Sequence, residues 1–134
     1  MTRATPDPAL PRTDAPSGAG RGSRRVWWLL LWLAIVTQFV VLYAPSAPGG
    51  PEVSGLDKVI HASVFGAPAL FALLAGVRPR WALGLLVLHA PVSELVQATM
   101  LPSRDGDMAD GVADVTGVAL ALGAFMVIRP TRRW

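Results

Sequence analysis

The chain has 134 residues, of which 52% are hydrophobic and only 16% are charged. A soluble domain usually carries about a quarter charged residues, so this composition argues against a single water-soluble core and favours a small membrane protein. The sequence contains no cysteine, which excludes a disulfide framework, a thiolate nucleophile and a cysteine-ligated zinc site.

The first segment, residues 1–25, combines four prolines, three glycines and five arginines. Without apolar periodicity it cannot bury enough surface to offset the cost of ordering the chain, so we expect a disordered basic tail.

Residues 26–44 carry no charge. At ~1.5 Å per helical residue they cover about 28 Å, close to the thickness of a bilayer core, and they form the first predicted span. Residues 45–57 are rich in proline and glycine and are predicted to be a loop.

Three further spans are predicted at residues 58–77, 81–101 and 107–128. Only fourteen uncharged residues follow Asp114 in the last of these, which is too short to span alone. We still expect a helix there, because its three aspartates can face the interior of a bundle instead of lipid. The predicted fold is an all-α, integral membrane four-helix bundle with a disordered N-terminal tail and a basic C-terminal tail, residues 129–134.

The basic residues predict the orientation of this bundle. With four spans, the arginines of the N-terminal tail, of the connection around residue 79 and of the C-terminus total ten on one side, and only Lys58 and Arg104 lie on the other. Basic residues collect on the cytoplasmic side, so we expect a multi-pass protein of the cell membrane with both termini cytoplasmic. Because the basic residues flank membrane spans, nucleic-acid binding is not expected.

Polar side chains inside the spans share helix faces. Lys58 and His61 are three residues apart, as are Glu94 and Gln97, and Asp110 and Asp114 are four apart. The helical rise places His61, Glu94 and Asp114 within about 10 Å of the outer surface. An acid at the centre of a span costs about 2.5–3.5 kcal/mol on insertion scales, so we expect these groups to meet in a shared interior. The small residues Gly117 and Ala121 continue the aspartate face and allow another helix to approach closely.

These residues form a pattern that resembles the VanZ-like membrane proteins over roughly residues 26–128. The pattern reads Asp57-Lys58-x-x-His61-x-x-x-Phe65, Glu94-x-x-Gln97, Pro102-x-Arg104 and Asp110-x-x-x-Asp114-x-x-Gly117. The resemblance implies a small four-helix membrane protein, and one member of that family is associated with resistance to teicoplanin-type glycopeptides. The chain departs from the family at Asp114, where an asparagine is usual.

The site prediction divides these residues by their chemistry. We expect catalytic groups at His61, Glu94 and Asp110, which can act as general acids or bases. We expect head-group binding by Lys58, Gln97, Arg104 and Asp114, with an anionic envelope lipid or a cell-wall precursor as ligand. Carboxylates at this depth also suit a divalent cation, and the sequence leaves metal and cofactor undecided. Whether the pocket catalyses a reaction or only binds its ligand is also left open.

Two other functions remain open from the sequence. Chains of acids and histidine mark proton or ion pathways in transporters, although here the ionisable groups gather in the outer half of the spans. Alternatively, the polar residues only hold a structural scaffold in register. A homo-oligomer is also compatible with the small-residue faces.

Overall fold

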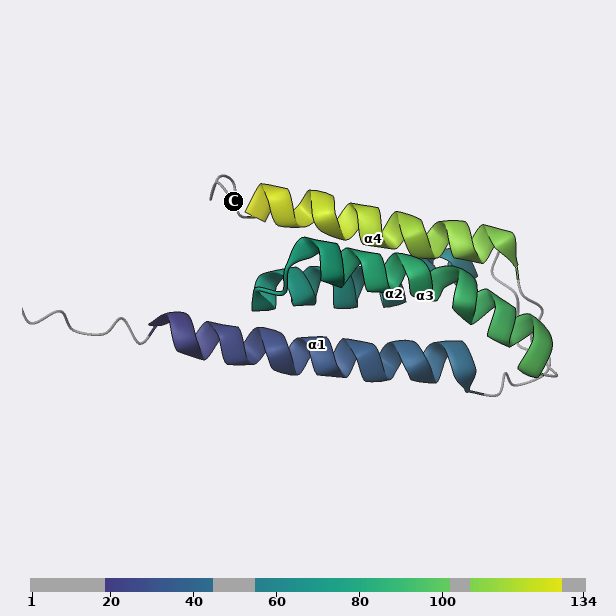
Figure 1. The fold of residues 1–134 in the computed structure, drawn as a ribbon, viewed down its shortest axis with the longest axis horizontal. Helices are drawn as coiled ribbons and strands as arrows, with labels where there is room; N and C mark the ends of the chain where they lie inside the picture. Colours follow the sequence, from purple (N-terminus) through teal and green to yellow (C-terminus); the bar gives the residue numbers. More distant parts are fainter. Residues whose placement is uncertain (1–18, 45–54, 102–106, 129–134) are drawn as a thin grey trace, which may run out of the picture.

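The computed structural model describes residues 19–44, 55–101 and 107–128, and these form four α-helices (Figure 1). Their bounds are α1 Ala19–Tyr43, α2 Leu56–Ala75, α3 Pro79–Met100 and α4 Met108–Ile128. The described residues contain no strand, and each helix is long and apolar enough to cross a membrane. The predicted all-α membrane bundle is thereby confirmed. Residues 1–18 and 129–134, most of the predicted 45–57 loop, and Arg104 lie outside the described residues.

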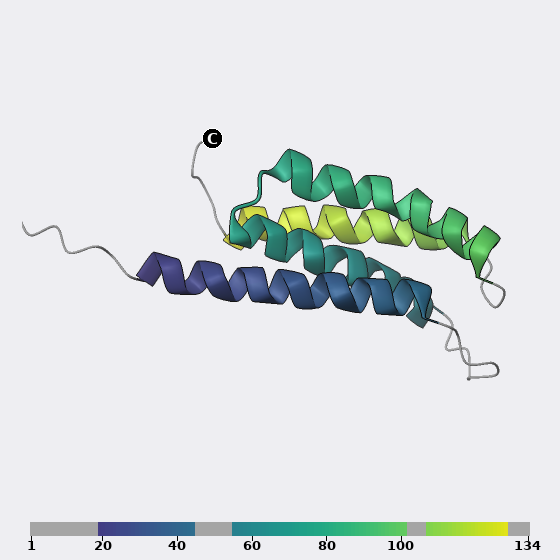
Figure 2. The same cartoon turned by 60° about the horizontal axis from the view of Figure 1, so that its bottom comes forward.

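The helices run alternately up and down, so α1 begins and α4 ends at the same end of the bundle (Figure 1). Helix α2 is the central element, because it contacts each of the other three helices and takes part in the two most extensive pairings, with α4 and with α1. Figure 2 shows α2 lying between α1 and α4. Its central position explains its burial: half of its apolar stretch is inside the protein, a larger share than in the other three helices.

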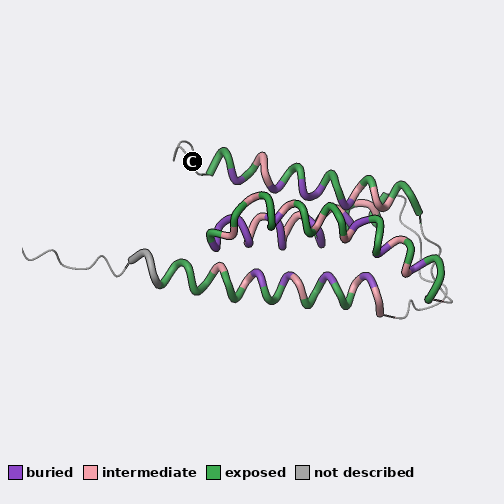
Figure 3. The backbone as a smooth tube through the Cα atoms, viewed as in Figure 1, coloured by how far each residue is buried: buried purple, intermediate pink, exposed green. Residues whose placement is uncertain are grey.

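The outer faces of the bundle are apolar. Exposed leucines follow α1, α3 and α4, including Leu33, Leu88 and Leu120, which are each more than 60% exposed. Figure 3 shows exposed residues along the outward side of these helices and buried residues on the side facing the bundle. So much exposed apolar surface is unfavourable in water. In a bilayer it contacts acyl chains, and the helices satisfy their own backbone hydrogen bonds.

The start of α1 corrects one prediction. Residues 19–25 were expected to belong to the disordered tail, but α1 begins at Ala19, seven residues before the predicted boundary at residue 26. Arg24 supplies a physical reason, because its Nε donates a 3.1 Å hydrogen bond to the Ala75 carbonyl at the end of α2. Arginine is also a good helix former. The basic flank therefore continues the helix and satisfies a terminal carbonyl of its neighbour.

The other helix ends lie within about two residues of their predicted positions. Helix α2 ends at Ala75, and the capping residue Gly76 has a φ of 89°, a left-handed conformation that glycine adopts readily. Helix α4 begins directly after Asp107, whose Oδ1 accepts a 2.9 Å hydrogen bond from the Ala109 backbone N–H. Asp107 is thus an N-cap that satisfies one of the free donors at the start of α4.

Helices α2 and α4 approach each other most closely where the small residues lie. A Cβ placed on Gly117 would overlap the backbone of Ala62, and a Cβ on Gly66 would lie 3.0 Å from the Gly117 carbonyl oxygen. The predicted close approach of a second helix to the Gly117 face is therefore observed, with α2 as the partner. This backbone proximity brings the side chain of His61, the neighbour of Ala62, into direct contact with Asp114, which lies about one turn before Gly117.

Candidate functional site

A group of polar side chains lies between α2, α3 and α4, at the end of the bundle where α1 ends. We call it the polar cluster, and its members are Lys58, His61, Glu94, Asp107, Asp110 and Asp114. The structure brings together five predicted site residues, Lys58, His61, Glu94, Asp110 and Asp114, which the sequence separates by up to 56 positions. The roles assigned to them remain predictions.

The imidazole of His61 is held between two carboxylates of α4. Its Nδ1 donates a 2.9 Å hydrogen bond to Asp114 Oδ1, and both residues are buried. Its Nε2 lies 3.7 Å from Asp110 Oδ2. Because Asp110 and Asp114 are four residues apart, their side chains stack on the same helix face. This arrangement fixes the orientation of the ring, as carboxylates do for histidines that act as bases or metal ligands.

Glu94 and Asp114 each have one bonded and one free oxygen. Glu94 Oε2 accepts a 2.8 Å hydrogen bond from the Asp107 backbone N–H, and Asp114 Oδ1 is bonded to His61. The other two oxygens, Glu94 Oε1 and Asp114 Oδ2, are buried without a hydrogen-bond partner among the described residues. One ligand atom from each of His61, Glu94 and Asp114 can be chosen so that all three lie within 4.8 Å of one another. These three residues can therefore converge on one small ligand.

Lys58 lies at the exposed end of the polar cluster. Its Nζ lies 3.0 Å from Asp57 Oδ2, 3.2 Å from Asp110 Oδ1 and 3.5 Å from Asp107 Oδ2, and its side chain is 42% exposed. Among the described residues, a single lysine thus serves three carboxylates, while Glu94 and Asp114 add two more acids. The described part of the site is acidic in sum. Arg104, the other predicted head-group ligand, lies outside the described residues.

Gln97 is directed to a different neighbour. It is buried, and its Nε2 donates a 3.1 Å hydrogen bond to the Leu42 carbonyl of α1. This amide nitrogen therefore links α3 to the last turn of α1, and the predicted part of Gln97 in head-group binding remains a prediction.

Sequence reasoning missed two features near the polar cluster. The Tyr43 hydroxyl and His89 Nε2 are hydrogen-bonded at 2.9 Å, and the His89 ring packs against Phe39 and Phe65. No local spacing links residues 46 positions apart, so this pair carries no sequence signal. The second feature is the double use of Asp107 as the cap of α4 and the partner of Glu94. An aspartate directly before an apolar run is an N-cap signal that could have been found.

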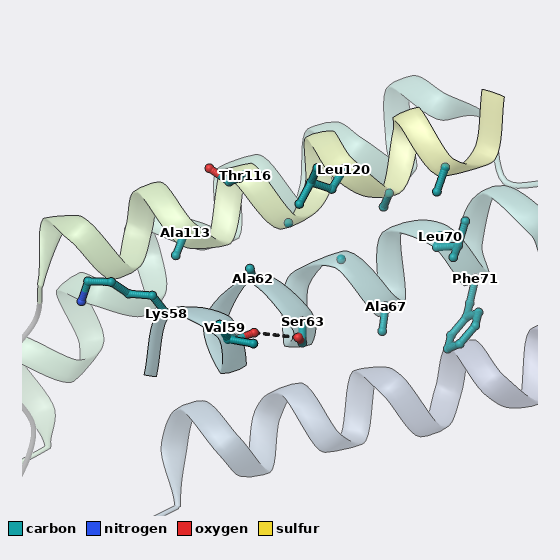
Figure 4. Close-up of a pocket in the computed structure, with 14 residues that line it drawn as sticks. Lys58, Val59, Ala62, Ser63, Ala67, Leu70, Phe71, Ala113, Thr116 and Leu120 are labelled. Atoms are coloured by element: carbon teal, nitrogen blue, oxygen red, sulfur yellow. Dashed lines mark hydrogen bonds between the residues drawn. The ribbon is translucent and has the colours of Figure 1, made fainter. Parts of the chain in front are cut away.

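Two grooves are each lined in part by a residue of the polar cluster. The larger, of about 750 Å³, lies between α2 and α4 and extends from Lys58 past Thr116 and Leu120 to Ala124. Figure 4 shows Lys58 at one end of this groove, with Leu120 and Leu70 farther along it. The second groove, of about 600 Å³, lies between α3 and α4, and Glu94 forms part of its wall.

No protein-family model matches the chain, and neither a curated protein nor a solved structure matches it.

Proposed function

We propose that this chain is a VanZ-like protein of the cell membrane, with both termini in the cytoplasm, that binds the anionic head group of an envelope lipid or lipid-linked cell-wall precursor. The polar cluster is the head-group site in this proposal. Support for the orientation comes from the ten-to-two division of basic residues across the predicted spans. Support for the family comes from the motif residues on α2, α3 and α4 described above.

The observation that carries the proposal is the position of Lys58. Its Nζ pairs with Asp110 in the polar cluster, and the same side chain lines the outer end of the α2–α4 groove. Small and apolar residues such as Ala67, Leu70 and Leu120 line the rest of the groove. A lipid that places an acyl chain along this groove brings its head group to the ammonium of Lys58. Apolar burial holds the chain and charge holds the head group.

The ion pairs of Lys58 allow an anionic head group to replace one of its carboxylate partners. The side chains of Asp57 and Asp107 are each about half exposed, so either carboxylate stays hydrated when a phosphate takes its place at Nζ. Exposed ion pairs of this kind contribute little to stability. An anionic head group therefore replaces a weakly held partner of Lys58.

A second function, catalysis on the bound head group, is favoured by the His61–Asp114 hydrogen bond of 2.9 Å. A histidine oriented by a buried carboxylate is the arrangement that general-base catalysis uses. In this version His61 accepts a proton from water or from a head-group hydroxyl. The purified protein should then turn over bound lipid. Loss of this turnover in His61→Gln, with lipid binding retained, would separate catalysis from binding.

The binding proposal is tested with dioleoylphosphatidylglycerol and dioleoylphosphatidylcholine, each titrated into the full chain in detergent micelles and followed by native mass spectrometry. The wild-type chain is expected to bind the anionic lipid more tightly. Lys58→Gln should remove that preference, and Leu120→Trp, which fills the groove, should weaken both lipids. Leu88→Trp is the matched control, since Leu88 is equally exposed and lines neither groove described above.

Equal binding of the anionic lipid by the wild-type chain and folded Lys58→Gln would refute the proposal.

The glycopeptide association has a separate test. Cells carrying the wild-type chain should tolerate more teicoplanin than cells carrying Glu94→Gln at the same protein level. Equal tolerance would remove that association.

A further inference from the structure

We infer that His61, Glu94 and Asp114 form a binding site for one divalent cation of the zinc class. The inference goes beyond the proposed lipid binding and does not depend on it, because the ligands and the free oxygens are present without any lipid. The three residues come from α2, α3 and α4, so a bound ion would also link these helices.

The geometry of the three residues fits a single ion. Their ligand atoms lie within 4.8 Å of one another. Zinc takes nitrogen and carboxylate ligands at about 2.0–2.2 Å in a tetrahedral arrangement, which places two ligands roughly 3.4 Å apart. The atoms therefore need to close by at most ~1.4 Å, which small side-chain rotations provide.

The free carboxylate oxygens are an independent observation that points to a ligand. Asp114 is fully buried, and in the described part of the chain its Oδ2 has no hydrogen-bond partner. Glu94 Oε1 is also buried and has no partner there. An unpartnered buried carboxylate oxygen is costly. The ammonium of Lys58 is engaged with Asp57, Asp107 and Asp110. A cation between Glu94 and Asp114 supplies the missing partner for both oxygens.

An outer partner orients Glu94. Its Oε2 accepts a hydrogen bond from the Asp107 backbone N–H, while its Oε1 stays available to an ion. Metal-binding carboxylates commonly have such outer partners, which orient the coordinating atom. His61 and Asp114 are in direct contact through Nδ1 and Oδ1, so a bound ion would replace the proton between them.

The composition of the site selects the class of ion. An imidazole nitrogen together with two carboxylates suits zinc and similar transition metals, whereas magnesium and calcium prefer oxygen ligands alone. Three protein ligands leave a fourth position open, as in zinc sites that hold a water or a substrate. Glu94 also lines the α3–α4 groove, which provides an approach to that position. In the lipid-binding function, the ion would offset the excess negative charge of the polar cluster.

The test uses the full chain in detergent, treated with EDTA and then dialysed separately against Zn²⁺, Mn²⁺, Mg²⁺ and Ca²⁺, with bound metal measured by atomic emission. The wild-type chain is expected to retain about one Zn²⁺, to unfold at a higher temperature when it is bound, and to lose both effects in EDTA. Glu94→Gln should weaken Zn²⁺ binding at least tenfold. Asp57→Asn is the matched control, because it removes an exposed carboxylate outside the three ligands and should bind as the wild type does.

A wild-type chain that stays helical and binds no Zn²⁺ would overturn the inference, as would tight binding of Mg²⁺ or Ca²⁺ without Zn²⁺. Because the variants can lose stability, Co²⁺ provides a second test on the wild-type chain alone. It should give a visible absorption spectrum distinct from that of aqueous Co²⁺, which Zn²⁺ abolishes; an aqueous spectrum would refute the site. Zn²⁺ binding without a lipid preference would refute only the lipid function, and the converse would refute only the metal site.

Discussion

The contact between Gly117 and Ala62 provides the sharpest test of how the fold builds the polar cluster. In Gly117→Ala the added Cβ would lie 2.7 Å from the Ala62 carbonyl carbon, whereas ordinary contacts lie at 3.4–4 Å. The atoms in its way belong to backbone, which cannot rotate aside, so α4 has to move away from α2 by about 1 Å. Overpacking of this kind costs 1–3 kcal/mol, and here we expect the upper part of that range.

The same displacement stretches the 2.9 Å bond between His61 and Asp114 beyond hydrogen-bonding distance. A buried polar group that loses its partner costs about 1–3 kcal/mol more. We therefore expect Gly117→Ala to lower the free energy of unfolding by roughly 3–5 kcal/mol, from the two effects together.

The assay is unfolding in mixed detergent micelles, followed by circular dichroism as the SDS fraction rises. Gly123→Ala is the matched control, because it lies on the same helix and its added Cβ would meet nothing within 4 Å. Alanine at position 123 should leave stability unchanged or raise it by up to ~1 kcal/mol, through helix propensity. Equal stability of the two variants would refute the close packing of α2 against α4 and the explanation it provides for the polar cluster.

Two further predictions concern the link to α1 and the orientation in the membrane. Gln97→Leu should lower the free energy of unfolding by about 1–3 kcal/mol, because the Leu42 carbonyl loses its buried donor. Thr99→Val, at an exposed position of the same helix, is the control and should be nearly neutral. Equal effects of the two variants would count against this link. Since the chain has no cysteine, single cysteines at Ser17 and Met100 report on orientation. A membrane-impermeant maleimide should label Met100→Cys in intact cells and Ser17→Cys only after lysis, and the reverse pattern would invert the proposed topology.

The four spans could be predicted from the sequence because hydropathy depends on composition within about twenty consecutive residues. The same local reasoning identified the polar residues within three of the spans and placed them on common helix faces, as for Lys58 with His61. It failed at residues 19–25, where composition indicated a disordered tail. There the structure continues the helix, and a tertiary contact from Arg24 to the Ala75 carbonyl contributes.

The sequence by itself determined which residues can span a membrane and which ionisable groups lie at a similar depth, because helical rise and periodicity are local properties. Only the tertiary structure decided which of those groups touch. Gly117 and Ala62 let α4 approach α2 closely enough for His61 to bond Asp114, while Gln97 is bonded to α1 and Glu94 to the start of α4. These partners depend on contacts between helices, which residue spacing along one helix does not specify.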